Sequence, residues 1–455
     1  MELPKSFAGS RCLMYGFGRS NRALARYLLK EGAKIFIYDG KKTKAKVLED
    51  AERDEIKELE VLNSLNEVKG DFLFRTPGVR PDIPEISDLV RNGTVLSSDT
   101  ELFFSRAKGK IYGITGSDGK TTTTMITAKI LENSFKNTEK RVFLGGNIGI
   151  PLVSFLDDIT ENDIVVSELS SFQLMTMKSS PQMSAITNIT ENHLDYHRDM
   201  KEYVEAKCRI FSGKGCNELV INTEALAFLK KECRNKPAFP NNVTEISSVG
   251  ECDGVYLKNG GIYLHGRRVI ESEQIKIPGL HNVENYMTAI GMTRNEASFE
   301  DIGFVAKNFR GAEHRMEFVK TVNGVSFYNS SIDSTPSRSI VTLKCFEKPL
   351  TVICGGYDKH LDYSDFALEL LKKADNVVIT GASAGVIKAA LGKYLGYGYK
   401  CNIYYEKNFE NAVERAASIS VRGGKVLLSP ASASFDAFVS FEERGNLFKN
   451  IVNAL

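Results

Sequence analysis

Residues Gly113-Ile114-Thr115-Gly116-Ser117-Asp118-Gly119-Lys120-Thr121-Thr122 form a glycine-rich segment between an apolar run and a helix-forming stretch. The run Lys110–Thr115 is predicted to be a strand, and a helix is predicted from Lys120 onward. Glycines let backbone N–H groups converge on phosphate oxygens, and a helix N-terminus adds positive potential. The segment therefore predicts a phosphate loop in which Lys120 reaches the terminal phosphates and Thr121 binds Mg²⁺.

The loop departs from the common pattern at one position. A glycine is usual five residues before Gly119, but this chain has Ile114 there, and Gly116 supplies the glycine instead. A phosphate loop alone does not show whether a nucleotide drives movement, switching or bond formation, so the rest of the chain must decide.

Strand and helix patterns alternate through the first hundred residues. Arg11–Tyr15 is an apolar run that ends in Gly16-Phe17-Gly18, a helical stretch covers Ser20–Glu31, and Lys34–Tyr38 precedes Asp39. A further strand is expected at Asp71–Arg75, followed by the turn Thr76-Pro77-Gly78. Alternating strands and helices predict a parallel sheet covered on both faces, here of Rossmann-like type.

The middle of the chain, around the phosphate loop, carries further elements. Strands are expected at Ile164–Ser167 and Ser184–Asn188, and a hairpin at Val255–Leu264 that turns on Asn259-Gly260-Gly261. His281–Thr293 has the pattern of an amphipathic helix.

A last set of strand patterns follows about residue 311, at Leu350–Ile353, Asn376–Ile379, Asn402–Tyr405 and Val426–Leu428, with helical stretches between them. The chain is therefore predicted to be an α/β protein of three domains. These are a Rossmann-like domain at 1–98, a P-loop ATPase domain with a parallel sheet at 99–311, and a second Rossmann-like α/β domain at 312–455.

Composition narrows the class of protein. The net charge of the 455 residues is only +2, which does not favour a nucleic-acid partner. The eight cysteines are scattered without a CxxC pair, so reduced thiols in the cytoplasm are expected rather than disulfides or a metal cluster. Met1–Lys5 lacks the pattern of a signal peptide, and no apolar run is long enough to span a membrane. We expect a cytoplasmic monomer that does not enter the membrane.

Short motifs continue from the phosphate loop along the chain. In order they are Leu144-Gly145-Gly146-Asn147-Ile148-Gly149, Glu168-Leu169-Ser170-Ser171-Phe172-Gln173-Leu174, Asn188-Ile189-Thr190-Glu191-Asn192-His193-Leu194-Asp195, Tyr203-Val204-Glu205-Ala206-Lys207, His281-Asn282-Val283-Glu284-Asn285, His314-Arg315-Met316-Glu317, Leu428-Ser429-Pro430-Ala431-Ser432-Ala433-Ser434-Phe435-Asp436 and Phe441-Glu442-Glu443-Arg444-Gly445. Together they resemble the Mur ligase family, over nearly the whole chain. The second and seventh motifs look most like those of members that add D-glutamate to UDP-N-acetylmuramoyl-L-alanine.

The resemblance implies a UDP-binding domain, a central ATPase domain and a domain that binds the incoming amino acid. It also implies a reaction of peptidoglycan precursor synthesis. ATP phosphorylates the alanyl carboxylate, the amino group of D-glutamate attacks the acyl phosphate, and phosphate leaves. Positioning and charge neutralisation carry most of the catalysis of phosphoryl transfer.

The catalytic residues implied by the resemblance are Lys120, Glu168, His193 and Lys207. Mg²⁺, in two ions, is expected on Thr121, Glu168, His193 and Lys207, with Lys207 carbamylated so that a cation becomes a metal-binding anion. Glu168 directly follows an apolar run, which suits a Mg²⁺ ligand. Taken without the resemblance, the group His193, Asp195 and His197 could also be a metal cluster or structural histidines.

Binding residues are likewise carried over from the resemblance. ATP is expected on Gly116, Ser117, Asp118, Gly119, Lys120, Thr121, Thr122, Asn285 and Arg315. The UDP-sugar is expected on Gly18, Arg19, Ser20, Asp39, Gly78 and Asn147. D-glutamate is expected on Lys359, Ser434 and Phe441.

One segment departs from the family. Where the family has Asn-Asp-Ser-Lys-Ala-Thr-Asn, this chain has Asn329-Ser330-Ser331-Ile332-Asp333-Ser334-Thr335. Ile332 replaces a lysine that would meet a D-glutamate carboxylate, and Ser330 replaces an acidic residue near the nucleotide. Either another cation takes over, or the preference for the amino acid has moved.

Other classes of function compete with a ligase. Gly16-Phe17-Gly18 with Asp39 resembles the fingerprint of an NAD-dependent oxidoreductase, although Asn21 stands at the third glycine position. If the chain were a non-enzymatic P-loop switch, the motifs around His193 and Ser434 would have no explanation. A Mur-type or folylpolyglutamate-like ligase for another amino acid is the alternative within the same class.

Overall fold

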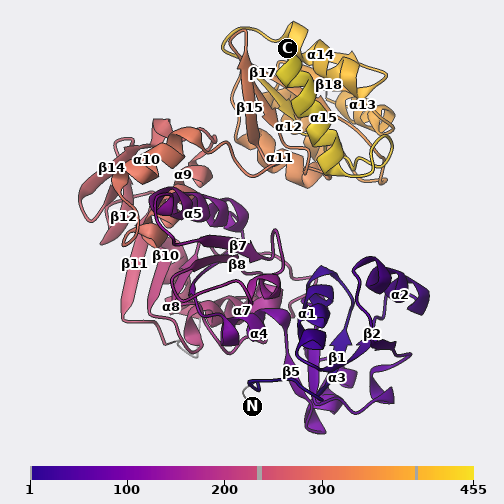
Figure 1. The fold of residues 1–455 in the computed structure, drawn as a ribbon. Coiled ribbons are helices and arrows are strands. Elements are labelled where there is room, and N and C mark those ends of the chain that lie inside the picture. The colour runs from indigo at the N-terminus through magenta and orange to yellow at the C-terminus, as the bar shows by residue number, and fades with distance from the viewer. Residues whose placement is uncertain (1–2, 233–237, 395–397) are drawn as a thin grey trace. The chain divides into compact units, whose positions relative to one another are not determined.

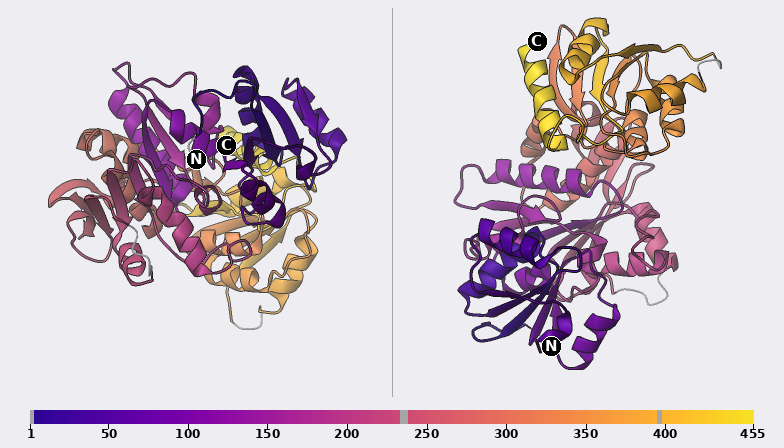
Figure 2. Two further views of the ribbon diagram at one scale, coloured as in Figure 1. Left: turned by 90° about the horizontal axis from the view of Figure 1, so that it is seen from below. Right: turned by 90° about the vertical axis from the view of Figure 1, so that its right-hand side faces the viewer.

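The computed structural model describes residues 3–232, 238–394 and 398–455. Met1, Glu2 and Cys233 lie outside these residues. The chain divides into two compact units, one made of Met1–Ser272 and Glu284–Val305, the other of Glu273–Val283 and Ala306–Leu455. Figures 1 and 2 follow the chain through both units from indigo to yellow.

The first sheet, at the start of the first unit, has the strand order β3-β2-β1-β4-β5, and every pairing is parallel. Its elements are β1 (Arg11–Tyr15), α1 (Arg19–Lys30), β2 (Lys34–Tyr38), α2 (Lys44–Arg53), β3 (Leu59–Val61), η1 (Leu65–Glu67), β4 (Phe72–Arg75), α3 (Pro84–Arg91) and β5 (Val95–Ser97). Alternate residues of β1 pack on opposite faces: Cys12 and Met14 join a core with α1 and α2, whereas Leu13 joins one with α3. Both faces are therefore covered, as expected of a parallel sheet.

The second sheet of this unit has the order β14-β13-β12-β11-β10-β9-β6-β8-β7. Its elements are α4 (Asp99–Arg106), β6 (Lys110–Thr115), α5 (Lys120–Phe135), β7 (Val142–Gly146), η2 (Leu152–Phe155), β8 (Ile164–Glu168), α6 (Ser171–Leu174), β9 (Met183–Ile186), α7 (Met200–Ser212), β10 (Glu218–Asn222), α8 (Thr223–Glu232), β11 (Asn242–Ser247), β12 (Gly254–Lys258), β13 (Gly261–Leu264), β14 (Arg267–Glu271), η3 (Ser272–Gln274), α9 (Leu280–Thr293) and α10 (Phe299–Asn308). The strands from β7 to β12 pair in parallel, and β12–β14 form an antiparallel edge. The expected hairpin is present, with positive φ at Asn259 and Gly260.

The helix α9 corrects one sequence-based prediction. We expected an amphipathic helix at His281–Thr293, and the helix is present, but every residue from Asn285 to Thr293 is buried. Gly291 shows how tightly it packs, because a Cβ there would lie 2.9 Å from Val220 of β10. This part of α9 is covered on all sides, so it has no solvent-facing stripe.

The sheet of the second unit has the order β15-β16-β20-β17-β18-β19 and is parallel except for the β15–β16 hairpin. Its elements are β15 (Glu317–Val322), β16 (Val325–Asn329), α11 (Pro336–Lys344), β17 (Leu350–Cys354), α12 (Ser364–Lys373), β18 (Asn376–Ile379), α13 (Ala384–Gly392), β19 (Asn402–Tyr405), α14 (Phe409–Ile419), β20 (Lys425–Leu428) and α15 (Phe441–Ala454). Val352 packs with α11–α13 on one face, and its neighbour Ile353 packs with α14 and α15 on the other.

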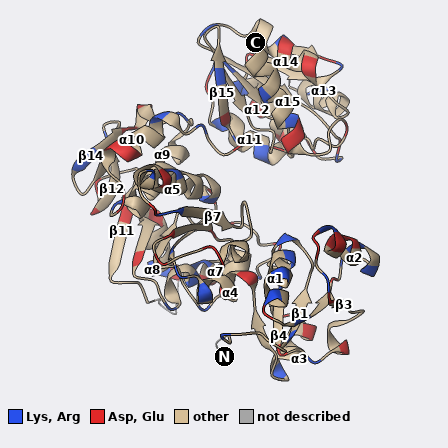
Figure 3. Cartoon of the chain, viewed as in Figure 1, with Lys and Arg blue, Asp and Glu red and all other residues tan. Residues whose placement is uncertain are grey.

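These sheets confirm the predicted α/β class. The boundaries proposed at 98 and 311 stay predictions. Among the described residues, no helix has the length and apolar character needed to cross a membrane. In the view of Figure 3 basic and acidic residues are interspersed along the elements, in line with the small net charge.

Candidate active site

The phosphate loop joins β6 to α5, as the sequence predicts. Gly116 and Gly119 have φ angles of +152° and +78°, which L side chains rarely adopt. A Cβ at Gly116 would overlap Thr187 Oγ1, and a Cβ at Gly119 would overlap Asn285 Oδ1. The backbone at both positions therefore requires glycine.

The residues after β9 hold this loop in place. Asp118 N donates to Asn188 Oδ1 at 2.9 Å, and Ser117 N donates to Asn188 O at 3.0 Å. Thr187 Oγ1 donates to Asp118 O at 2.6 Å. We expected Ser184–Asn188 to be a strand, and β9 covers Met183–Ile186. Thr187 N still donates to Thr115 O of β6 at 3.0 Å, whereas the Thr187 side chain and Asn188 bond to the phosphate loop. The loop is thus preformed.

Two lysine side-chain nitrogens lie against the loop. Lys120 Nζ donates to Gly116 O at 3.0 Å and to Ser117 O at 2.8 Å. Lys207 of α7 donates to the same Gly116 O at 2.6 Å. The Lys207 side chain is 1% exposed, and burial together with the charge of Lys120 lowers its pKa well below the usual value. Burial therefore shifts Lys207 toward its neutral amine form.

Thr121 and Glu168 come together beside Lys120. Thr121 Oγ1 donates to Glu168 Oε2 at 2.8 Å, and Asn147 Nδ2 donates to Glu168 Oε1 at 2.7 Å. Glu168 ends β8 and is 1% exposed. A hydroxyl and a carboxylate next to a phosphate loop are oxygen ligands of the kind that Mg²⁺ takes together with nucleotide phosphates. The residues present therefore fit a Mg·nucleotide complex.

His193 and His197 occupy different surroundings. His193 has a φ of +56° and its ring lies 4.9 Å from that of Phe172, while burial and the charge of Lys120 lower its pKa. His197 is 1% exposed and its Nε2 lies 2.9 Å from Ser171 Oγ. The described part of the chain contains no group of three His, Cys, Asp or Glu side chains that could hold a metal ion. A cluster of His193, Asp195 and His197 is therefore not formed.

Comparison with known proteins identifies the family. The sequence model of the Mur ligase middle domain matches residues 114–293, and that of the Mur ligase glutamate ligase domain matches residues 314–432. The UDP-N-acetylmuramoylalanine--D-glutamate ligase of Ruminiclostridium cellulolyticum is 41% identical over 100% of this chain and 98% of its own length. The enzyme of the same name from Clostridium novyi is also 41% identical, over 97% and 96%. The chain belongs to the Mur ligase family.

A solved Mur ligase shares the fold at lower identity. The UDP-N-acetylmuramate-alanine ligase of Thermotoga maritima has a TM-score of 0.56 and 20% identity, and the match covers 98% of this chain and 99% of that one.

The predicted UDP-sugar residues of this Mur ligase gather at one sheet edge, with one exception. Gly18, Arg19 and Ser20 follow β1, Asp39 follows β2 and Gly78 follows β4, and these three strands are neighbours. Both Asp39 oxygens accept backbone N–H groups, from Phe17, Lys41 and Lys42 at 2.8–3.1 Å. Asp39 thus shapes the loop, which weakens the interpretation as an NAD site. Asn147 is the exception, because it follows β7 and contacts Glu168.

The predicted amino-acid residues of the Mur ligase lie on loops at the carboxyl edge of the second unit's sheet. The loop carrying Lys359 pairs with the loop carrying Ser434 through Tyr357 N and Ala433 O at 2.9 Å. Phe441 begins α15, and its carbonyl accepts from Ser331 Oγ at 2.8 Å. Asn285 lies at the phosphate loop of the first unit, and Arg315 belongs to the second unit. These roles stay predictions.

Sequence reasoning gave no role to Arg444, which organises the same loops. Its guanidinium is 2% exposed and donates to Ser331 Oγ and O, Ser432 O and Ala433 O at 2.8–3.1 Å. Burial lowers the pKa of Arg444 to about 10. The Phe-Glu-Glu-Arg-Gly motif marked this residue, but only the fold shows which carbonyls it binds.

Arg75 was also missed, and it joins the first sheet to the second. It is 1% exposed and donates to Val79 O at 2.8 Å and to Phe172 O at 2.7 Å. The turn that carries Gly78 is thereby tied to α6, which follows Glu168 in sequence.

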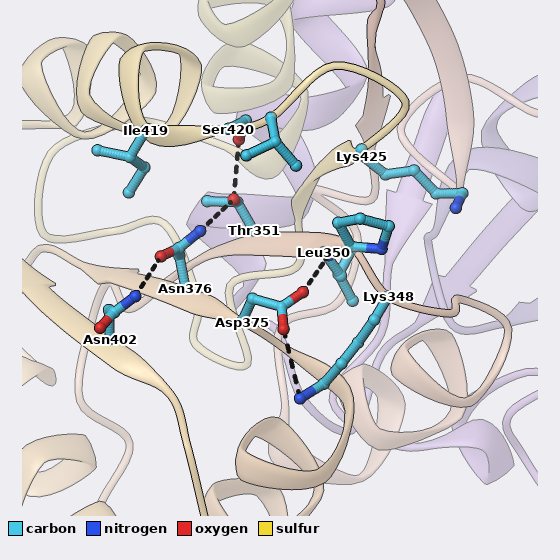
Figure 4. Close-up of a pocket in the computed structure, with 12 residues that line it drawn as sticks. Lys348, Leu350, Thr351, Asp375, Asn376, Asn402, Ile419, Ser420 and Lys425 are labelled. Carbon is cyan, nitrogen blue, oxygen red and sulfur yellow. Dashed lines mark hydrogen bonds and ion pairs between the residues drawn. The ribbon is translucent and has the colours of Figure 1, made fainter.

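A cavity of about 490 Å³ lies elsewhere, at the amino ends of β17–β20 (Figure 4). Lys348 Nζ lies 3.4 Å from Asp375 Oδ1 on its wall, and Asn402 Nδ2 donates to Asn376 Oδ1 at 3.0 Å. Ligands of parallel α/β sheets bind at the carboxyl ends of the strands. The cavity is thus at the opposite edge from the predicted amino-acid residues and is not part of the candidate site.

Proposed function

We propose that this Mur ligase uses ATP to join D-glutamate to the alanyl carboxylate of UDP-N-acetylmuramoyl-L-alanine. The substrates are inferred from relatives that are 41% identical over nearly their full length. The observation that carries the reaction class is the contact of Thr121 with Glu168 at 2.8 Å, next to Lys120 on a preformed phosphate loop. It supports binding of a magnesium nucleotide at this place.

The reaction has two balanced steps. A carboxylate oxygen of the alanyl group takes the terminal phosphoryl group of ATP, giving an acyl phosphate and ADP. The amino nitrogen of D-glutamate then bonds to the acyl carbon, the C–O bond to phosphate breaks, and the nitrogen loses a proton. Mg²⁺, when bound, supplies positive charge to the transferring phosphoryl group.

The chain's own residues prepare the first step. The loop N–H groups and the N-terminus of α5 attract phosphate oxygens. On nucleotide binding, Lys120 is expected to exchange its bonds to Gly116 O and Ser117 O for bonds to phosphate. Thr121 and Glu168 are the proposed Mg²⁺ ligands, and Asn147 holds the second Glu168 oxygen in place.

A carbamate on Lys207 is part of this proposal, as are a second Mg²⁺ and His193 as its ligand. The neutral Lys207 nitrogen would bond to the carbon of CO₂ and release one proton, so that a buried amine becomes an anion. Burial lowers the pKa of Lys207 from its usual value, which supports this step because only the unprotonated amine is nucleophilic. NMR of the protein in ¹³C-bicarbonate should show a carbamate carbon that is absent from Lys207→Arg.

We also propose that the enzyme acts as a cytoplasmic monomer. None of the seven cysteines that the structure describes is in a disulfide, which supports a reducing compartment.

A second candidate function is ligation of a different amino acid, and Ile332 in place of the family lysine favours it. The test is an assay of ADP release with UDP-N-acetylmuramoyl-L-alanine and a panel of D- and L-amino acids. We expect D-glutamate to give the highest kcat/KM, and a preference for another amino acid would overturn the assignment. With ¹⁸O in the alanyl carboxylate, one labelled oxygen should appear in the released phosphate.

A further inference from the structure

A tight turn follows β4, at the edge of the first sheet where the predicted UDP-sugar residues gather. Val79 N donates to Thr76 O at 3.0 Å, which closes this 76–79 turn around Gly78. Thr76 N donates to Tyr15 O at 2.9 Å, so the turn stays next to the end of β1. Gly78 is exposed, and a Cβ placed on it would meet no atom within 4 Å. The outer side of the turn is therefore open to a ligand.

The inner side of the same turn is bound by Arg75, the last residue of β4. Its guanidinium is buried, and its two terminal nitrogens serve different segments. Nη1 donates to Pro77 O at 3.1 Å and to Val79 O at 2.8 Å. Nη2 donates to Phe172 O of α6 at 2.7 Å and to Thr176 Oγ1 at 3.1 Å. Because the guanidinium is planar and rigid, it fixes the position of the turn relative to α6.

The predicted metal ligand His193 begins a second turn, which meets the first. Tyr196 N closes this His193 turn by donating to His193 O at 3.0 Å. The Tyr196 hydroxyl donates to Pro77 O at 2.9 Å and to Val79 O at 3.2 Å, the two carbonyls that the guanidinium also binds. The ring of Phe172 lies 4.1 Å from that of Tyr196 and 4.9 Å from that of His193. The two turns are therefore bonded to each other, and both contact α6.

The His193 turn needs such support. His193 has a φ of +56°, a conformation that costs energy in a residue with a side chain and persists only where the surroundings hold it. Its contacts with Phe172 and Tyr196 supply these surroundings, and Arg75 holds the backbone of Phe172. A change at Arg75 should therefore reach both turns.

We infer that Arg75 is a positioning residue, which holds the 76–79 turn and the His193 turn in the arrangement that the reaction requires. The inference rests on the proposed function for the assignment of Gly78 to the UDP-sugar and of His193 to Mg²⁺. The acceptors of Arg75 are neutral oxygens, and a charged donor makes stronger hydrogen bonds to them than a neutral donor does. A lysine has a single nitrogen and cannot hold two segments in a fixed relation.

The test measures ligand binding as well as turnover. Arg75→Lys keeps the charge and removes the fork, and calorimetry should show the Kd for UDP-N-acetylmuramoyl-L-alanine raised about tenfold. The Mg²⁺ concentration that gives half-maximal ADP release should rise about threefold, because the His193 turn is less well held. A merely structural role would instead lower the number of binding sites per chain and leave both constants unchanged. That result would overturn the inference.

The matched control is an exposed ion pair that also joins the first sheet's helices to the neighbouring part of the unit. Lys30 Nζ of α1 lies 2.5 Å from Asp157 Oδ2, which follows η2. Lys30→Met should leave both constants within about twofold of wild type, because a surface ion pair contributes little. An equal rise for Lys30→Met and Arg75→Lys would contradict a specific role of Arg75.

Tyr196→Phe gives an independent measurement that does not require an arginine variant to fold. It removes only the hydroxyl, and Pro77 O and Val79 O keep the guanidinium as a donor, so the Kd for the UDP-sugar should rise about threefold. Combined with Arg75→Lys, it leaves the two carbonyls without both donors, and Kd should rise by more than the product of the single effects. An unchanged Kd for Tyr196→Phe, or a double variant equal to that product, would contradict the inference.

The two proposals fail in different ways. A wild-type protein that binds UDP-N-acetylmuramoyl-L-alanine but prefers another amino acid would contradict the proposed substrate, and the Kd values would still decide the role of Arg75. A wild-type protein that does not bind this sugar nucleotide would overturn both.

Discussion

The phosphate loop of the first unit and the loop at 329–335 of the second unit are built differently. The phosphate loop depends on its backbone conformation: φ is positive at Gly116 and Gly119, and the N–H groups of Ser117 and Asp118 donate to O and Oδ1 of Asn188. The 329–335 loop has backbone bonds too, but buried side chains add to them, chiefly Asp333, Ser429 and Arg444.

This difference explains where the sequence could change. A loop that depends on its backbone conformation accepts almost no substitution at its glycines, because a Cβ at Gly116 or Gly119 would overlap a neighbour. A loop held by side-chain bonds accepts substitution more readily, because another side chain can supply a bond. The chain matches the family closely in the first loop and departs from it in the second, at Ser330, Ile332 and Asp333.

Removing the ammonium group from the phosphate loop should have the largest effect. Lys120→Ala is expected to lower kcat for ADP release by at least about 10³-fold, because charge neutralisation carries most of phosphoryl transfer. Lys129→Ala, an exposed position on the same helix paired with Glu132, is the control and should stay near wild type. Robust turnover by the Lys120 variant would count against the site.

A methyl group on the loop tests its backbone directly. Gly116→Ala should lower kcat/KM about 100-fold, because the residue would be strained at φ +152° and would displace Thr187. Gly385→Ala, where no atom lies within 4 Å of the added Cβ, should change kcat/KM less than about twofold. Similar values for both variants would show that the loop is not as rigid as its geometry indicates.

Removing a buried side-chain bond from the 329–335 loop should lower the stability of the protein as well as its activity. Arg444→Met leaves the Ser331, Ser432 and Ala433 carbonyls without their buried donor, and we expect the free energy of unfolding to fall by about 2 kcal/mol. Urea titration measures this. Arg415→Met, which breaks an exposed pair with Glu406, should cost less than about 1 kcal/mol.

The contribution of Asp333 to the stability of the 329–335 loop should also depend on pH. We expect this effect to be the smallest. The folded pKa of Asp333 is raised, so its contribution to stability is greatest at low pH and is lost as pH rises through the folded pKa. The unfolding free energy of wild type minus that of Asp333→Asn should therefore fall from pH 4 to pH 7. Arg315, Arg444 and Cys345 are the ionisable groups that influence this site.

The control for the pH experiment is Asp365→Asn, an exposed position on α12. Its stability difference from wild type should stay constant over the same pH range. A constant difference for Asp333→Asn as well would contradict the sign of its pKa shift.

Much of the fold followed from the sequence because buried parallel strands are continuous apolar runs. Lys34–Tyr38, Lys110–Thr115 and Asn376–Ile379 were predicted with the bounds that the structure shows. The three-residue strands β3 and β5 were missed because so short a pattern is not distinctive. The β15–β16 hairpin was missed too, although Asn323-Gly324, both with positive φ, is a strong signal for a tight turn.

Less of the candidate site than of the fold could be predicted from the sequence. The neighbourhood of Lys120 and Thr121 could be predicted, since it depends on residues close in the chain. The contact of Asn147 with Glu168 depends on the register in which Gly146 pairs with Glu168 across β7 and β8. The carbonyls bound by Arg75 and Arg444 depend on how loops fold over the sheet ends, and no local pattern encodes that.

The antiparallel strands at the end of the central sheet have a consequence for how copies of the chain meet. A long parallel sheet that ended on an apolar strand would offer its unpaired backbone to any other strand in a crowded cell. Here the last strand is short, begins with the exposed Arg267 and Arg268, and follows a register shift at Ile262/Tyr263. The exposed charges and the register shift at that border disfavour pairing with a strand of another copy.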